Sequence, residues 1–109
     1  MAVNTRSPLE TLLNAQAVTF KPERPRPGSR LSITYEGLLA RKPGREVYAH
    51  LGYGRDAWTG IDDLQMTRRS DTSCECTVTL SGPGPLNVSF RDSDGEWDNN
   101  QGMNWQLKS

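Results

Sequence analysis

The prediction of the fold starts from residues 46–51, which have the sequence Glu-Val-Tyr-Ala-His-Leu. Small apolar residues alternate here with bulky polar or aromatic ones, which is typical of a β-strand with one buried face. Successive side chains of a strand point to opposite sides. The inward set is therefore Val47, Ala49 and Leu51. The same geometry places Tyr48 and His50 on the outer face.

The same alternation recurs along the rest of the 109-residue chain, between turns rich in glycine and proline. Strands are predicted over residues 18–20, 31–35 with an extension to about 39, a short run at 64–66, then 74–80, 86–90 and 104–107. The glycine-rich stretch 52–60 is predicted to be a loop. About seven short strands in a chain of this size indicate one all-β domain, an immunoglobulin-like two-sheet antiparallel β-sandwich.

An N-terminal arm is expected to precede the sandwich. Residues 7–10, Ser-Pro-Leu-Glu, match a helix start, so a short helix is predicted around 8–16. Three prolines then disfavour regular strand pairing over 21–28, which is predicted to be an extended edge or link. We therefore divide the chain into an arm, 1–26, and a β-sandwich module, 27–109, with the first strand beginning as early as residue 17.

The charge balance limits the classes of partner. Thirteen basic and thirteen acidic residues give a formal net charge of zero. Neither a basic stripe for nucleic acid nor a basic amphipathic face for a membrane is evident, so neither partner is predicted. The first residues do not read as a signal peptide, which favours the cytoplasm. A secreted chain whose leader had been removed would look the same.

No metal site or cofactor is predicted. Cys74 and Cys76 are the only cysteines and His50 is the only histidine, which is too few ligands for a closed zinc site. The two cysteines are predicted to be small buried side chains. Residues 92–95, Asp-Ser-Asp-Gly, resemble the start of a calcium loop, but the spacing does not fit an EF-hand. A structural cation at this turn is left open.

A candidate binding site comes from residues that fall on loops or outward positions. Residues 95–102 place Trp97, Asp98, Asn99 and Asn100 between two glycines, a composition typical of an ordered surface loop. Trp58 lies in the glycine-rich loop that follows His50. Indole rings can cover the apolar face of a sugar ring, and imidazole, carboxylate and amide groups can bond its hydroxyls. Trp105, which alternates with Leu107, is assigned to the core.

These motifs, in this order, resemble the starch-binding carbohydrate-binding modules of families 25 and 53. The resemblance covers about residues 27–107 and rests on the strand end at 47–53, on Trp58 and Met66, and on the Trp-Asp-Asn-Asn loop at 97–100. It implies a β-sandwich that binds α-1,4-glucans without catalysis, with His50, Trp58 and Trp97 in contact with the sugar. Asp98, Asn99 and Asn100 complete the predicted site, and at least one of these three is expected to serve only the loop.

Two other classes of function have less support in the sequence. A glycosidase needs two carboxylates that face each other across a cleft, whereas the acids here cluster in one loop, so no enzyme activity is predicted. An immunoglobulin-like protein-interaction module without sugar binding is the alternative. Because no leader is visible, intracellular glycogen is a hypothesis for the glucan beside starch, and the choice between the two is left open. A carbohydrate-active enzyme is a further candidate partner, and the oligomeric state is left open.

Overall fold

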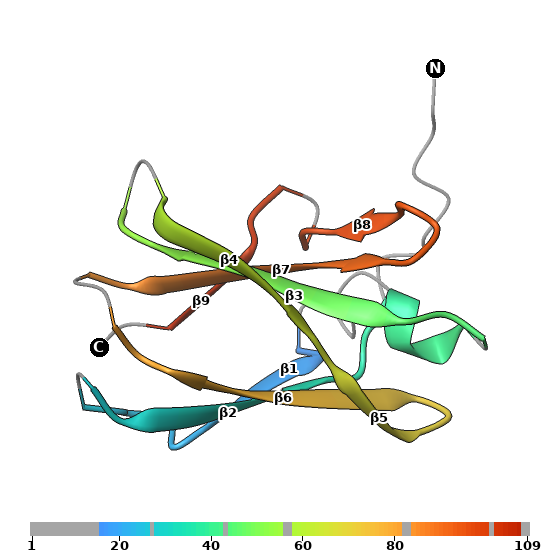
Figure 1. Cartoon of the computed structure of the whole chain (residues 1–109), viewed down its shortest axis with the longest axis horizontal. Helices are drawn as coiled ribbons and strands as arrows, with labels where there is room; N and C mark the ends of the chain where they lie inside the picture. Colours follow the sequence, from blue (N-terminus) through green and yellow to red (C-terminus); the bar gives the residue numbers. More distant parts are fainter. Residues whose placement is uncertain are drawn as a thin grey trace.

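Two antiparallel sheets pack face to face in the computed structural model of this chain (Figure 1). The structure describes residues 16–26, 28–42, 44–55, 58–81, 84–100 and 102–107. The predicted two-sheet antiparallel β-sandwich is confirmed. The helix predicted around 8–16 lies outside the described residues except for Gln16, which is in a turn.

Strand order follows the immunoglobulin pattern. The four-stranded sheet has the order β1-β2-β6-β5, as A-B-E-D does in that fold. Its strands are β1 (Val18–Lys21), β2 (Arg30–Tyr35), β6 (Ser73–Thr79) and β5 (Thr67–Ser70). The second sheet has the order β4-β3-β7-β8, and β9 also pairs with β7. Its strands are β4 (Thr59–Gln65), β3 (Val47–Tyr53), β7 (Leu86–Asp92), β8 (Trp97–Asp98) and β9 (Trp105–Leu107).

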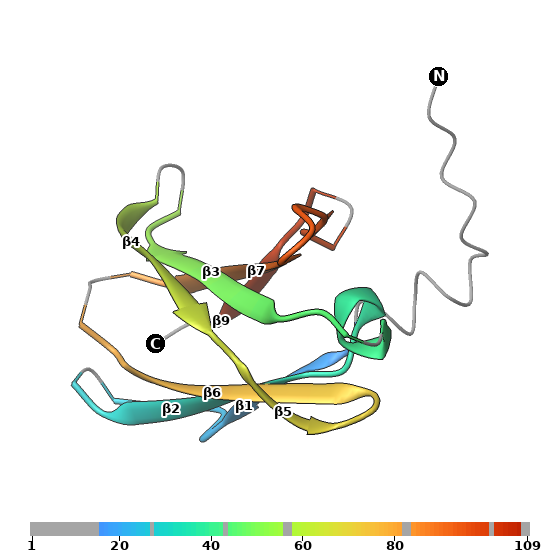
Figure 2. The same cartoon turned by 45° about the vertical axis from the view of Figure 1, so that its right-hand side comes forward.

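The predicted strand boundaries were wrong in four places, and the described residues hold nine strands instead of about seven. The run predicted around 64–66 is split at the buried Met66, where the chain leaves β4 and crosses to the other sheet as β5 (Figure 2). The strand that starts at Arg30 ends at Tyr35, and the 3-10 helix η1 (Leu38–Arg41) follows it. The predicted 97–100 loop begins with the short strand β8.

The predicted loop at 52–60 is also shorter than expected. Strand β3 continues through Gly52 to the buried Tyr53, and β4 begins at Thr59. Gly52 contributes to the ladder because it pairs with Asn87 on β7. This extension carries strand β3 two residues beyond the end predicted from the sequence.

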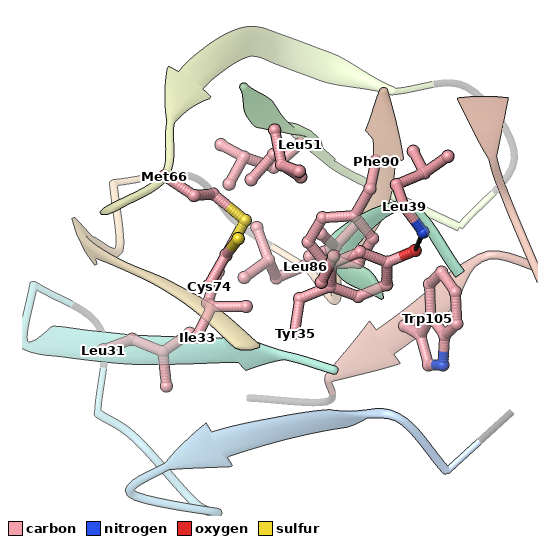
Figure 3. Packing of buried hydrophobic residues seen from close by; sticks show 14 of the residues in the cluster. Leu31, Ile33, Tyr35, Leu39, Leu51, Met66, Cys74, Leu86, Phe90 and Trp105 are labelled. Carbon is pink, nitrogen blue, oxygen red and sulfur yellow. Dashed lines mark hydrogen bonds between the residues drawn. The ribbon is translucent and has the colours of Figure 1, made fainter. Parts of the chain in front are cut away.

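The core consists of the inward rows of both sheets (Figure 3). The rings of Tyr35 and Phe90 stack with centroids 3.9 Å apart, and Trp105 meets both rings edge-on. Trp105 is 6% exposed, which confirms its assignment to the core. Cys74 is buried beside Met66, whereas Cys76 is only partly buried, and both thiols are free. Burial raises the pKa of Cys76 to about 11.

The described residues contain no helix with the length and apolar character needed to cross a membrane.

Candidate functional site

The outer face of the five-stranded sheet gathers most of the residues singled out from the sequence. Antiparallel pairing of β3 with β4 and β7 places His50 between Asp63 and Ser89. The same pairing places Tyr48 between Gln65 and Arg91, and Trp97 of β8 lies opposite Arg91. Residues that are far apart in the sequence therefore share one continuous surface because side chains in register project from the same side of a sheet.

Trp58 reaches this surface because Gly52 has no side chain. A Cβ atom built on Gly52 would lie 2.9 Å from Cβ of Trp58 and 3.0 Å from its ring atom Cε3. It would also lie 3.3 Å from Cγ1 of Ile61. Contacts of 2.9–3.0 Å are too short for carbon atoms, so the side chain of Trp58 occupies the place where any other residue at position 52 would project. The position of Trp58 therefore requires a glycine at residue 52.

Three predicted residues meet in one aromatic cluster, which we define as His50, Trp58 and Trp97. The imidazole of His50 is stacked on Trp58, with centroids 5.6 Å apart and planes inclined by 29°. Trp97 approaches the same imidazole edge-on, at 5.2 Å and 87°. The two indole planes are therefore inclined to each other by at least 58°, the difference between those two angles. Trp97 is 53% exposed, so its ring is available to a ligand.

Polar contacts hold His50 within the cluster. Its Nδ1 lies 2.9 Å from Oδ1 of Asp63. The same carboxylate oxygen accepts a hydrogen bond from Nε of Arg91 at 3.3 Å. The guanidinium of Arg91 lies over the ring of Tyr48, 4.5 Å from its centroid. Tyr48 is thus the cross-strand partner of Arg91.

Asp98, predicted as a sugar contact, is buried beneath the loop. Its side chain is 3% exposed, and its carboxylate accepts a hydrogen bond from the hydroxyl of Tyr35. It also accepts one from the backbone N–H of Asn100 at 3.3 Å. Burial, followed by the neighbouring carboxylate, raises the pKa of Tyr35 and keeps the phenol protonated. Asp98 anchors the loop to the core, which fits the expectation that part of this motif is structural.

The side chains of Asn99 and Asn100 form hydrogen bonds with the backbone of their own loop. Oδ1 of Asn99 accepts a hydrogen bond from the N–H of Gly102 at 2.9 Å. Nδ2 of Asn100 donates to the carbonyl of Asn104 at 3.2 Å. Asn100 has a φ of 55°, in the left-handed region that asparagine tolerates. Asn99 is exposed and Asn100 is partly buried, so both retain exposed surface.

The acidic turn before Trp97 is held by a side chain of the protein itself. Arg45 forms ion pairs with Asp92 at 2.9 Å, Asp94 at 3.0 Å and Glu96 at 3.3 Å. Burial alone would disfavour the ionised form of Asp92, but hydrogen bonds from Glu96, Arg45 and Asp94 outweigh it and lower its pKa. Positive charge at this turn therefore comes from Arg45 and from Lys42, which pairs with Glu96. Across the described ranges, no group of acid, histidine and cysteine side chains is suited to a metal ion.

A groove of about 680 Å³ lies elsewhere, where β4 passes into β5. It is lined by residues 44–47 and 65–68 and by Cys74. Both of its arginines are already engaged, because Arg45 binds the acidic turn and Arg68 donates to the carbonyls of Ala40 and Ser70. None of the residues of the aromatic cluster lines this groove, and we assign no function to it.

Sequence reasoning missed four residues of the site: Asp63 and Arg91, which reach its surface, and Gly52 and Ser89, which are buried beneath it. Arg91 and Ser89 could have been found, because they take the outward positions of the strand whose inward row is Leu86, Val88 and Phe90. Asp63 could not, since its place beside His50 depends on the register between β3 and β4. That register includes a shift between Leu51 and Tyr53, which no local pattern announces.

The fold and this surface define a β-sandwich domain with an exposed aromatic cluster on one sheet. No protein-family model matches the chain. A curated alpha-amylase of Clostridium acetobutylicum is 33% identical to it over 92 residues. The aligned part covers 83% of this chain and 12% of the amylase, so the similarity is to a small segment of that enzyme.

Proposed function

We propose that this chain is a non-catalytic module that binds α-1,4-glucan, of the type found in starch-binding families 25 and 53. The glucan would lie on Trp58 and Trp97, with His50 between them as a polar contact. Asn99 and Asn100 would contribute amide groups at the edge, while Asp98 holds the loop from below. The sugar itself and the type of module are inferences from the residues and from the amylase similarity.

The inclination of the two indoles is the observation that carries this proposal. Indoles cover the C–H face of a sugar ring at little cost in conformational entropy. Two coplanar rings suit a flat glucan such as cellulose, whereas rings inclined by at least 58° suit the curved chain of an α-1,4-glucan. The acids of the 92–98 segment do not face each other across a cleft: Asp92, Asp94 and Glu96 bind Arg45, and Asp98 is buried.

Affinity for a single chain should be modest. The surface is open, and the cluster can cover only a few sugar units, so we expect a Kd of roughly 10–1000 μM per site. Tight attachment to a granule would then require several sites on one assembly. The similarity to a segment of an amylase makes a carbohydrate-active enzyme the natural partner, and both glycogen and starch remain candidate ligands.

Affinity electrophoresis in gels containing amylopectin, glycogen or hydroxyethylcellulose tests the proposal. We expect amylopectin and glycogen to retard the wild-type protein, and we expect the cellulose derivative not to do so. Trp58→Ala and Trp97→Ala should each remove the retardation, because loss of a central aromatic contact costs about 2 kcal/mol or more. Thr77→Ala, on the outer face of the other sheet, is the control and should behave as wild type.

Native circular dichroism spectra must accompany the variants, so that loss of binding is separated from loss of fold. If neither α-glucan retards the wild-type protein, the sugar-binding proposal fails. An immunoglobulin-like interaction module would then be the better interpretation of the same fold.

A further inference from the structure

Asp63 has no role in the site as predicted from the sequence, yet it makes the polar contact that orients His50. It projects from β4 directly opposite His50 in the β3–β4 register. Its Oδ1 lies 2.9 Å from Nδ1 of the imidazole. The side chain of His50 is 24% exposed and that of Asp63 is 38% exposed, so neighbouring residues partly shield this contact from solvent.

This contact determines which ring nitrogen carries the proton. A neutral imidazole has one N–H donor and one nitrogen acceptor, and a carboxylate can only accept. Nδ1 must therefore carry the hydrogen that faces Asp63, which leaves Nε2 with a lone pair. Within the part of the chain that the structure describes, no residue is hydrogen-bonded to Nε2. Nε2 is the ring nitrogen that does not face Asp63, and it belongs to an imidazole that contacts both Trp58 and Trp97.

Asp63 is itself held in place by its neighbours. Nε of Arg91 donates to the same Oδ1 at 3.3 Å. Arg91 is supported by the ring of Tyr48, whose hydroxyl donates to Oε2 of Glu46 at 2.9 Å. A row of side chains thus runs across three strands and ends at the imidazole. Such a row limits the rotation of both Asp63 and His50, which is what positions a ligand contact accurately.

We propose that Asp63 is a positioning residue that keeps His50 as the Nδ1–H tautomer, so that Nε2 accepts a hydrogen bond from a ligand hydroxyl. The inference rests on the proposed function and makes it more specific. The surface selects a neutral polyhydroxylated ligand whose hydroxyl donates at this point, between two sugar units stacked on the tryptophans. A ligand that presents only an acceptor there would be disfavoured.

The tautomer can be measured directly because His50 is the only histidine in the chain. Two-bond ¹H–¹⁵N correlation spectra of the full chain, labelled with ¹⁵N-histidine and recorded where the imidazole is neutral, distinguish the two tautomers. We expect the wild-type protein to show the Nδ1–H form. Asp63→Ala should change the spectrum toward the Nε2–H form and weaken binding to maltooligosaccharide by about three- to tenfold, the loss of one oriented hydrogen bond.

Glu75→Ala is the matched control, because it removes an exposed ion pair with Arg69 on the other sheet. It should leave both the tautomer and the affinity unchanged. An Nε2–H tautomer in the wild-type protein would overturn the inference without any variant. So would Asp63→Ala if it changed the tautomer and left the affinity intact. If the wild-type protein does not bind α-glucan at all, the proposed function fails, and the ligand role of Nε2 fails with it.

Discussion

The outer faces of the two sheets are both in contact with solvent, yet they differ in kind. The four-stranded sheet presents short hydroxyl side chains, with Thr19 opposite Thr34 and Ser32 opposite Thr77, together with the exposed ion pair of Arg69 and Glu75. The five-stranded sheet presents Trp97, Trp58, His50 and Arg91. Small polar and charged residues are sufficient to keep a sheet face in water, as the first sheet demonstrates. The aromatic cluster on the second sheet is therefore not a requirement of the fold, and a ligand is its simplest explanation.

The two faces also differ in how much buried structure supports them. The hydroxyl face depends on strand pairing and on exposed side-chain contacts such as that of Arg69 with Glu75. The aromatic face depends on three supports. They are the space at Gly52, the buried carboxylate of Asp98 that bonds the hydroxyl of Tyr35, and Arg45, which pairs with the acids of the turn before Trp97. Substitutions of these supports should damage the aromatic face selectively. The damage should be greatest when Asp98 is substituted, smaller for Gly52 and smallest for Arg45.

Asp98→Ala should have the largest effect. It removes the acceptor for the buried hydroxyl of Tyr35 and the anchor of the loop that carries Trp97. An unsatisfied buried polar group costs about 1–3 kcal/mol, so urea unfolding should show a stability loss of this size together with loss of glucan binding. Tyr35→Phe together with Asp98→Ala removes the hydroxyl and the carboxylate together but leaves the N–H of Leu39, which donates to that hydroxyl at 3.1 Å, without its acceptor, so it should recover only part of the stability and none of the binding. Unchanged stability of Asp98→Ala would contradict the anchoring role.

Gly52→Ala should damage binding more than stability. The added methyl group would meet Trp58 at 2.9 Å, so the indole must move away from β3 and from His50. Crowding of this kind costs about 1–3 kcal/mol where the site is rigid and less where a side chain can move outward. We expect reduced retardation by amylopectin with a native circular dichroism spectrum, and Thr77→Ala on the hydroxyl face serves as the control. If amylopectin retarded Gly52→Ala as strongly as the wild-type protein, Trp58 would not need this space.

Acid should weaken the aromatic face through the turn that precedes β8. The pKa of Glu96 is lowered by hydrogen bonds from Lys42 and Arg45, and that of Asp92 is lowered despite its burial. A lowered pKa in the folded state gives stability that is complete above the unfolded values of 4.5 and 3.8 and is lost as the pH falls below them. Unfolding free energies measured from about pH 6 down to about pH 3 should therefore decline.

Arg45→Met provides the comparison for this acid effect. The variant should be less stable than wild type near neutral pH, and the difference should narrow as the acids become protonated. Arg69→Met removes an exposed pair on the other sheet and is the control, since exposed ion pairs contribute little. A difference between Arg45→Met and wild type that stays constant with pH would exclude this coupling.

Local sequence patterns predicted the side-chain directions well because those directions depend only on the alternation within a strand. His50 and Tyr48 face outward, Trp105 is in the core and Trp97 is exposed, as expected from their immediate neighbours. Strand limits were predicted less well. Met66 occupies a crossing between sheets and Gly52 lies within a strand, because pairing with distant segments overrides the local tendency of glycine to interrupt one.

The sandwich class, the inward rows and the residues of the aromatic cluster could thus be read from the chain alone, since period-two alternation and turn composition are local properties. Three features emerge only in the folded molecule: Asp98 is buried under Tyr35, Trp58 occupies the space over Gly52, and Asp63 binds His50. The first joins β8 to β2 of the other sheet, and the other two depend on how the consecutive strands β3 and β4 pair with each other. Register is set by the packing of the whole sandwich, which no single stretch of sequence contains.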